Sequence, residues 1–87
     1  APSPNPFNPR TTIRLEIAPD SGHASLRIYS LAGRLVRAVD LTGLGAGVHD
    51  LVWNGKDDRG IGVASAVYFV RLKTRDATDV KRVVLLK

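Results

Sequence analysis

The sequence predicts an all-β fold in which two antiparallel sheets pack face to face as a sandwich. Short segments of alternating apolar and polar residues recur along the 87-residue chain at intervals of about 8 to 15 residues. Between them lie clusters of Gly, Pro, Asn and Asp, which favour turns. No segment keeps the spacing of an amphipathic helix over three turns. A chain of this length forms one domain with a thin core.

The first two predicted strands show the clearest alternation. The first starts at residue 11 and places Ile13, Leu15 and Ile17 on one face. Residues 19–22, Pro-Asp-Ser-Gly, predict a turn because proline presets φ and glycine permits a positive φ. The second strand spans residues 23–31. Its inward face is expected to carry Ala24, Leu26 and Ile28.

A hairpin and a glycine-rich loop frame the next two strands. The Ala-Gly pair at residues 32–33 predicts a tight connection to a third strand, which runs from residue 34 to about residue 41. Residues 42–47 contain three glycines and are expected to form a loop. The fourth strand, residues 48–54, then places His49, Leu51 and Trp53 on one side, so we expect the Trp53 ring to lie in the core.

A second loop and two further strands complete the pattern. Residues 55–62 are rich in Asp and Gly and predict a turn-forming loop. The fifth strand covers residues 65–74. We expect its inward face to be the one that carries Tyr68, Val70 and Leu72. After a turn at residues 75–77, the last strand spans residues 78–86 and is rich in β-branched valine.

The first ten residues predict an extended arm in front of the sandwich. They hold four of the five prolines. Proline fixes φ and restricts the residue before it, so a polyproline-like conformation is expected. The chain therefore divides into a Pro-rich arm, residues 1–10, and a β-sandwich, residues 11–87.

Charge and composition narrow the possible functions. The formal net charge is +5, but the basic residues are spread along the whole chain. Solvent-facing positions of strands explain them, so we expect no nucleic-acid partner. An anionic surface such as a lipopolysaccharide-bearing envelope would satisfy the same charge. The chain has no cysteine for a disulfide or thiolate metal site, and no apolar run long enough to predict a transmembrane segment.

No catalytic constellation is visible in the sequence. His23 follows a turn, and His49 shares its strand face with Trp53, which favours a packing role. Asp57 and Asp58 resemble a cation-binding loop, but calcium needs 6 to 8 oxygen ligands and basic side chains flank this pair on both sides. We therefore expect turn-stabilising hydrogen bonds from these carboxylates, no metal, no cofactor and no enzymatic activity.

Four segments in order carry a family resemblance: NPFNPRTTIRLEI, LRIYSLAGRLVRAV, GAGVHDLVWNGKDDRGIGVASAVYFVRL and KRVVLLK. They resemble a type A C-terminal sorting domain of the bacterial type IX (Por) secretion system. They equally resemble the related immunoglobulin-like domain of the flagellar hook-capping protein family. Both imply a seven-stranded antiparallel immunoglobulin-like β-sandwich. The structural motif residues that carry the likeness are Asn5, Pro6, Phe7, Asn8, Pro9, Gly33, His49, Trp53, Gly55, Asp57, Gly60 and Tyr68.

The sorting resemblance implies a non-catalytic domain that directs a secreted bacterial protein to the cell surface. Its partners would be the secretion machinery, reached by β-strand addition, and an anionic envelope glycolipid. A terminal β-branched strand with a basic tip is an edge to which such machinery can pair. The expected sorting residues are Val83, Val84, Leu85, Leu86 and Lys87.

A second hypothesis assigns the chain a structural role outside the cell. The Pro-rich arm at one end and the hydrophobic strand at the other could each be donated to a neighbouring copy. The domain would then be a subunit of an extracellular filament or sheath, assembled by β-strand complementation between copies.

Overall fold

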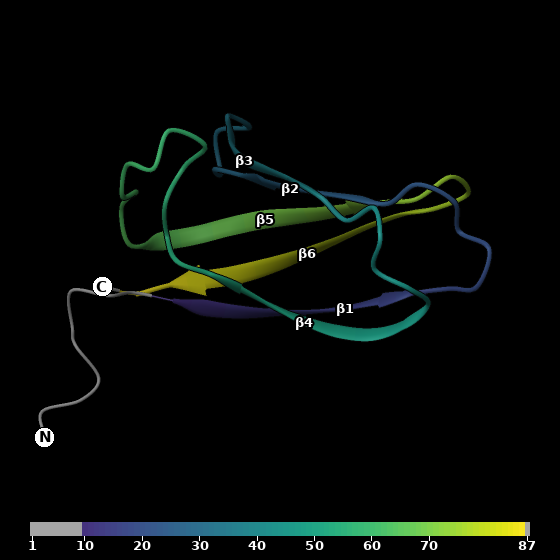
Figure 1. Cartoon of the computed structure of the whole chain (residues 1–87). Helices are drawn as coiled ribbons and strands as arrows, with labels where there is room; N and C mark the ends of the chain where they lie inside the picture. The colour runs from purple at the N-terminus through teal and green to yellow at the C-terminus, as the bar shows by residue number, and fades with distance from the viewer. Residues whose placement is uncertain (1–9, 87) are drawn as a thin grey trace, which may run out of the picture.

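Six antiparallel strands in two sheets make up the fold (Figure 1). The structure is a computed structural model that describes residues 10–86. Within this range there is no helix, and hence none that is long and apolar enough to cross a membrane. The strands are β1 (Thr11–Ile17), β2 (Ser25–Tyr29), β3 (Leu35–Asp40), β4 (Gly47–Trp53), β5 (Ala66–Lys73) and β6 (Thr78–Leu85).

The two sheets differ in size. β1 pairs with β4 in a two-stranded sheet, and the other four strands form a sheet in the order β3–β2–β5–β6. In Figure 1, β1 and β4 lie together below β5 and β6. Since β4 follows β3 in the chain but pairs with β1, the chain passes repeatedly from one sheet to the other. This crossing connectivity joins the two sheets into a single sandwich.

The described residues do not confirm the expected number of strands. The family resemblance implies seven strands, but residues 10–86 form six. These are the six segments in which apolar and polar residues alternate. Of the intervening segments, the Gly-rich loop forms no strand, and the loop after β4 contains only an isolated bridge between Lys56 and Gly62. The predicted arm, residues 1–10, lies outside the described residues except for Arg10.

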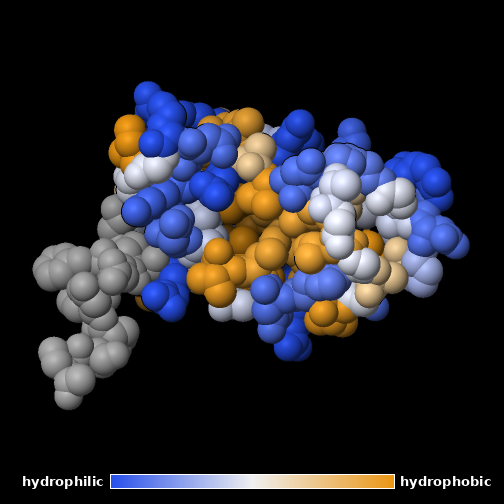
Figure 2. Space-filling view, in the orientation of Figure 1, coloured by the Kyte–Doolittle hydropathy of each residue, from blue (hydrophilic) through white to orange (hydrophobic). Residues whose placement is uncertain are grey.

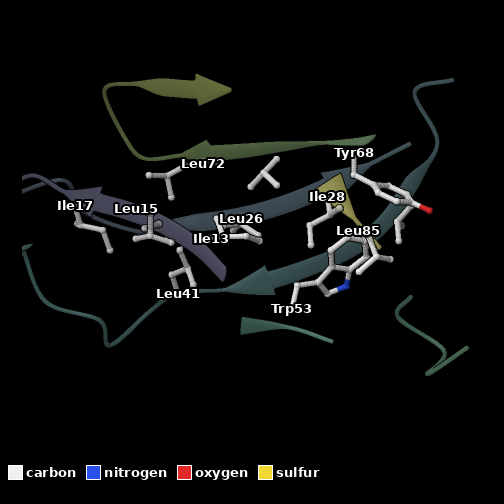
Figure 3. Packing of buried hydrophobic residues seen from close by; sticks show 13 residues of the cluster. Ile13, Leu15, Ile17, Leu26, Ile28, Leu41, Trp53, Tyr68, Leu72 and Leu85 are labelled. Atoms are coloured by element: carbon white, nitrogen blue, oxygen red, sulfur yellow. The ribbon is translucent and has the colours of Figure 1, made fainter. Parts of the chain in front are cut away.

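The inward-facing side chains of the strands fill the space between the two sheets. β1 buries Ile13, Leu15 and Ile17, which confirms the face predicted for it. Figure 3 shows side chains from both sheets meeting in this layer. The buried cluster consists of Ile13, Leu15, Ile17, Ala24, Leu26, Ile28, Val36, Leu41, Trp53, Tyr68, Val70, Leu72 and Leu85.

The inward faces of β4 and β5 also follow the alternation. In β4, Leu51 is partly buried and Trp53 is only 3% exposed, as expected for a core tryptophan. In β5, Tyr68, Val70 and Leu72 are buried, which confirms the face favoured for this strand. The alternation thus determines which side chains the two sheets share.

A groove of about 580 Å³ lies where β1 and β6, the facing edges of the two sheets, come together. Leu15, Leu26 and Leu72 contribute apolar atoms to its lining. Figure 2 shows apolar side chains gathered in the middle of this view, in the area that β1, β5 and β6 occupy in Figure 1. At its rim, the Lys81 Nζ donates to the backbone carbonyl of Arg14, so a polar bond links the sheets at this edge.

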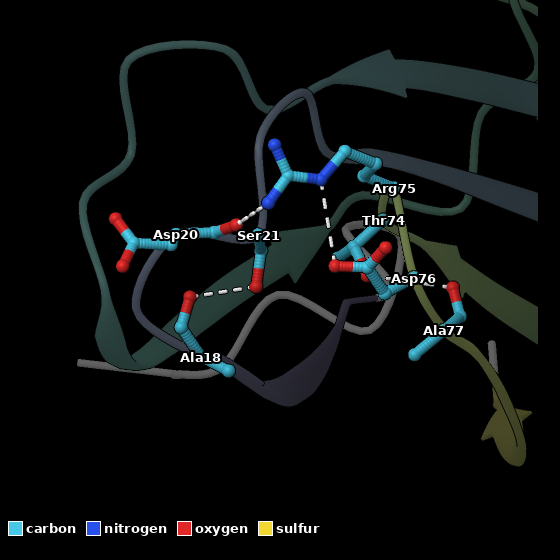
Figure 4. A network of polar contacts seen from close by, with 7 residues as sticks. All are labelled: Ala18, Asp20, Ser21, Thr74, Arg75, Asp76 and Ala77. Carbon is cyan, nitrogen blue, oxygen red and sulfur yellow. Dashed lines mark hydrogen bonds and ion pairs between the residues drawn. The ribbon is translucent and has the colours of Figure 1, made fainter.

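A polar network joins the β1–β2 turn to the β5–β6 turn (Figure 4). The Arg75 backbone N–H donates to the Ser21 carbonyl at 3.0 Å, and its guanidinium donates to the Asp20 carbonyl. The Ser21 hydroxyl donates to the Ala18 carbonyl at 2.6 Å. Gly22 has a φ of 70°, in the left-handed region that favours glycine. Turns far apart in sequence therefore brace each other.

Candidate functional site

The centre of the predicted motif is an aromatic pair that bridges the two sheets. Trp53 comes from β4 and Tyr68 from β5, and their ring centroids lie 5.0 Å apart at an interplanar angle of 81°. This edge-to-face arrangement places the positive edge of one ring against the negative face of the other. Figure 3 shows both rings at one end of the buried layer, near Leu85. The pair closes that end of the core.

Both rings have their polar atoms satisfied by the backbone. The Trp53 Nε1–H donates to the Lys56 carbonyl at 2.9 Å, and the Tyr68 hydroxyl donates to the Ala64 carbonyl at 2.6 Å. Burial raises the pKa of the Tyr68 phenol above its ordinary value. A phenol held neutral and bonded to a carbonyl is suited to holding the 56–64 loop against the core.

Asp57 organises the loop that follows Trp53. Its Oδ1 accepts hydrogen bonds from the backbone N–H groups of Arg59 and Ile61, each at 2.9 Å. The hydrogen bond from the Ile61 N–H lowers the pKa of the Asp57 carboxyl most, and the bond from the Arg59 N–H lowers it further. Gly60 has a φ of 80°, and its N–H donates to the Asp57 carbonyl at 2.9 Å. The carboxylate therefore acts as a turn cap.

Asp58, the next residue, covers the outer edge of β3. Its backbone N–H donates to the Val36 carbonyl at 3.0 Å, and its Oδ1 accepts from the Ala38 N–H at 3.1 Å. An edge strand with free backbone groups invites pairing with other chains. Here the loop occupies these groups as a neighbouring strand would. This role could not be predicted from the sequence, because Val36 and Ala38 belong to another part of the chain and the pairing depends on the fold.

The two histidines lie in separate surroundings. The His49 ring is partly buried, and its Nε2 lies 2.7 Å from the Gly45 carbonyl oxygen. His23 is exposed beside Asp40 and Thr42, with its Nδ1 2.7 Å from the Thr42 hydroxyl. Hydrogen bonds from the Thr42 hydroxyl and backbone N–H lower the pKa of the Asp40 carboxyl. The His49 contact holds the Gly-rich loop near β4, and the Thr42 contacts hold the start of that loop near Asp40 of β3 and His23.

Across residues 10–86, no group of three or more His, Cys, Asp or Glu side chains is placed to hold a metal ion. Asp57 and Asp58 each direct a carboxylate oxygen to backbone N–H groups, and Arg59 lies 3.8 Å from the second Asp57 oxygen. Turn capping and edge covering account for the hydrogen bonds of this acidic pair.

Two of the remaining motif residues, Gly33 and Gly55, lie at turns. Gly33 and Gly55 have φ values of 86° and 74°, in the β2–β3 hairpin and just after β4, and this left-handed region favours glycine. The part of the motif that comprises Asn5, Pro6, Phe7, Asn8 and Pro9 lies outside the described residues.

The predicted sorting segment is part of the sheet. β6 is an edge strand, paired with β5 in register from Thr78 to Leu85. Leu85 is fully buried and Val83 is partly buried, whereas Val84 and Leu86 are exposed. Lys87 lies outside the described residues. The segment therefore completes the core with its inward side chains.

The fold and the contacts of residues 10–86 define the class of protein. This is an all-β, two-sheet domain of the immunoglobulin-like type, in which the described motif residues lie at turns, on strands and in the core. The chain belongs to the family described as the FlgD Ig-like domain, whose model matches residues 6–78.

Solved structures of FlgD share the fold. FlgD from P. aeruginosa matches with a TM-score of 0.69 and 22% identity, covering 88% of this chain and 60% of that one. Truncated FlgD from Helicobacter pylori matches with a TM-score of 0.67 and 15% identity, covering 95% of this chain and 64% of that one. The chain thus spans less than two thirds of either structure. A comparison with curated proteins found none that matches.

These findings correct the predicted identity and function. The sorting-domain prediction is wrong, because the family match and both structural matches are to FlgD. The same matches contradict the predicted partners, which were the type IX machinery and an envelope glycolipid, and the predicted cell-surface location. They also contradict the alternative prediction of an extracellular filament subunit built by strand complementation. The family match also ends at residue 78, before the predicted sorting residues Val83, Val84, Leu85, Leu86 and Lys87.

Proposed function

We propose that this chain is the immunoglobulin-like domain of a flagellar hook-capping protein of the FlgD type, in which it serves as a rigid, non-catalytic module. The observation that carries the proposal is the match to the FlgD Ig-like domain over most of the chain. FlgD-like relatives are structural rather than enzymatic, which supports the expectation of no catalysis. The motif residues Gly33, His49, Trp53, Gly55, Asp57, Gly60 and Tyr68 are then the residues that hold the module in shape.

The contacts favour a rigid module. The aromatic pair closes one end of the core, and the Arg75 network ties two turns together at the other ends of the strands. Asp58 covers the β3 edge, which reduces unwanted pairing with other chains. A part of a larger assembly needs a defined shape and protected edges, and these contacts provide both.

The test is hook assembly in the bacterium that carries the gene. The natural, full-length protein is replaced by a version that lacks residues 11–85, and by matched Trp53→Ala and Val52→Ala variants. Trp53 is buried and Val52 is 61% exposed, so only the first should disturb the domain. We expect few or no hooks by electron microscopy with the deletion, fewer hooks with Trp53→Ala, and a normal number with Val52→Ala.

Normal hooks in the deletion strain would overturn the proposal. A His49→Ala variant tests the non-catalytic part of it. We expect hooks in normal number with this variant. If the folded variant abolished hooks although its level and stability matched those of the parent protein, His49 would have a role beyond packing, which would contradict the proposal.

A further inference from the structure

The outer face of the four-stranded sheet carries a row of cations from three strands. Arg27 on β2 lies directly opposite Arg71 on β5, and Lys73 lies opposite Ser25. Arg82 on β6 lies opposite Phe69 of β5. All of these positions alternate with buried ones such as Leu26 and Leu72, so they point away from the core. We call Arg27, Arg71, Lys73 and Arg82 the cationic face.

These cations have no neutralising partner within the described chain. The ion pairs formed among residues 10–86 use Arg14, His23, Arg59 and Arg75 instead. Two like charges placed directly opposite each other on neighbouring strands destabilise a sheet. The Arg27–Arg71 pair therefore works against folding, and neither sheet formation nor core packing requires it.

Arg71 is held in place rather than left free. Its guanidinium carbon lies 5.3 Å from the centroid of the Tyr29 ring, and its Nη2 donates to the Tyr29 hydroxyl at 3.0 Å. Its Nε is buried without a hydrogen-bond partner within residues 10–86, which costs stability. A cation fixed in this way loses little side-chain freedom when an anion binds.

A shallow depression of about 560 Å³ lies over the same strands. Arg27, Arg71, Lys73 and Arg75 line it, together with the hydroxyl-bearing Ser25 and Thr74. The nearby Asp40 carboxylate is turned to Thr42 and His23. Several cations and two hydroxyls thus converge on one concave area.

We propose that this cationic face docks an acidic, extended segment of a protein partner. Arg71 and Lys73 are two residues apart on β5, so their side chains repeat at about 6.6–6.8 Å, the same spacing as alternate Asp or Glu side chains in an extended segment. Guanidinium groups bind carboxylates through paired hydrogen bonds. This names a partner class for the proposed hook-capping module and rests on that proposed function.

The neighbours of the cations favour a protein over a nucleic acid. Single-stranded nucleic acids stack their bases on open aromatic rings. Here the Arg71 guanidinium lies over the face of the Tyr29 ring, where a base would stack. The exposed Val80 and Val84 of β6 and the partly buried Phe69 add apolar contact beside the charges. Protein interfaces combine arginine and aromatic side chains with such apolar area.

The test is binding of the purified chain to a labelled peptide that alternates Asp with Val or Thr, with an Asn-for-Asp peptide as a control. We expect Arg27→Gln/Lys73→Gln to weaken binding about tenfold. The control Arg34→Gln/Lys56→Gln removes the same charge from other exposed positions and should change binding less than about twofold. Backbone NMR shifts on peptide addition should concentrate on β2 and β5.

Equal losses in the two double variants, shifts scattered over the surface, or no binding would overturn the proposal. So would tighter binding of oligothymidine or of phosphatidylglycerol vesicles to the same face. The double variant Arg27→Gln/Lys73→Gln should keep or raise the midpoint of urea denaturation, because it relieves the like-charge pair. This assay needs no flagellum, so its failure would leave the hook-assembly proposal to stand or fall on its own test.

Discussion

Replacing Trp53 by alanine tests the packing of the whole domain. The ring is 3% exposed, contacts Tyr68 edge to face and donates to the Lys56 carbonyl. Removing a buried tryptophan costs about 3–5 kcal/mol. Within this loss, the ring contact contributes about 0.5–1.5 kcal/mol and the hydrogen bond a similar amount. A domain of this length has a total stability of about 4–13 kcal/mol, so the change removes a large part of it.

The measurement is urea denaturation followed by far-UV circular dichroism, because Trp53 is the only tryptophan and its fluorescence disappears with the variant. Trp53→Phe keeps an aromatic ring but leaves the Lys56 carbonyl without its donor, and should cost about 2 kcal/mol. If Trp53→Ala does not fold, Trp53→Phe still gives a measurable loss in the free energy of unfolding.

Val52→Ala is the matched control for the Trp53 variants. Val52 is the preceding residue and points outward with 61% exposure, so its loss should stay below about 1 kcal/mol. A loss below about 1 kcal/mol for Trp53→Ala, or one equal to that of Val52→Ala, would refute a structural role for the ring.

Further predictions concern β6 and the Asp57–Asp58 loop. Leu85→Ala should cost about 2–5 kcal/mol in urea denaturation, because Leu85 is fully buried, and Leu86→Ala less than about 0.5 kcal/mol, because Leu86 is 74% exposed; equal losses would contradict the packing of β6. The lowered pKa of Asp57 stabilises the fold above the ordinary Asp value of about 3.9, and this part is lost as pH falls through the folded-state pKa. Asp57→Asn should therefore flatten the fall in thermal midpoint on acidification below about pH 4, and an unchanged profile would argue against the turn cap. Asp58→Ala should uncover the β3 edge and increase self-association in sedimentation experiments, whereas a strictly monomeric variant would show that the loop is not needed as a cover.

The alternation of apolar and polar residues predicts the strands well, since each strand has one buried and one solvated face. It assigns Ile13, Leu15 and Ile17 to the core, and it identifies Trp53 and Tyr68 as inward residues of different strands. What it cannot supply is which strands lie side by side. The bonds from Asp58 to β3 and from Arg75 to the first turn join residues 20 and 55 positions apart. The facing of Arg27 and Arg71 likewise depends on the β2–β5 register.

The predicted function was wrong for a related reason. The residues that carry the resemblance, such as Gly33, Trp53 and Tyr68, lie at turns and in the core. Such residues specify an immunoglobulin-like sandwich, and they are common to proteins that share the fold but differ in function. They could not separate a sorting domain from a hook-capping domain.

The most direct test of the hook-capping account is the position of the full-length protein on growing hooks. An epitope is fused to the protein in its own bacterium, and isolated hook intermediates are labelled with gold-conjugated antibody and viewed by electron microscopy. If the chain belongs to a hook-capping protein, we expect label at the free end of the hook, and loss of this label when Trp53→Ala unfolds the domain. Label spread over the cell surface, or hooks that carry none, would contradict it.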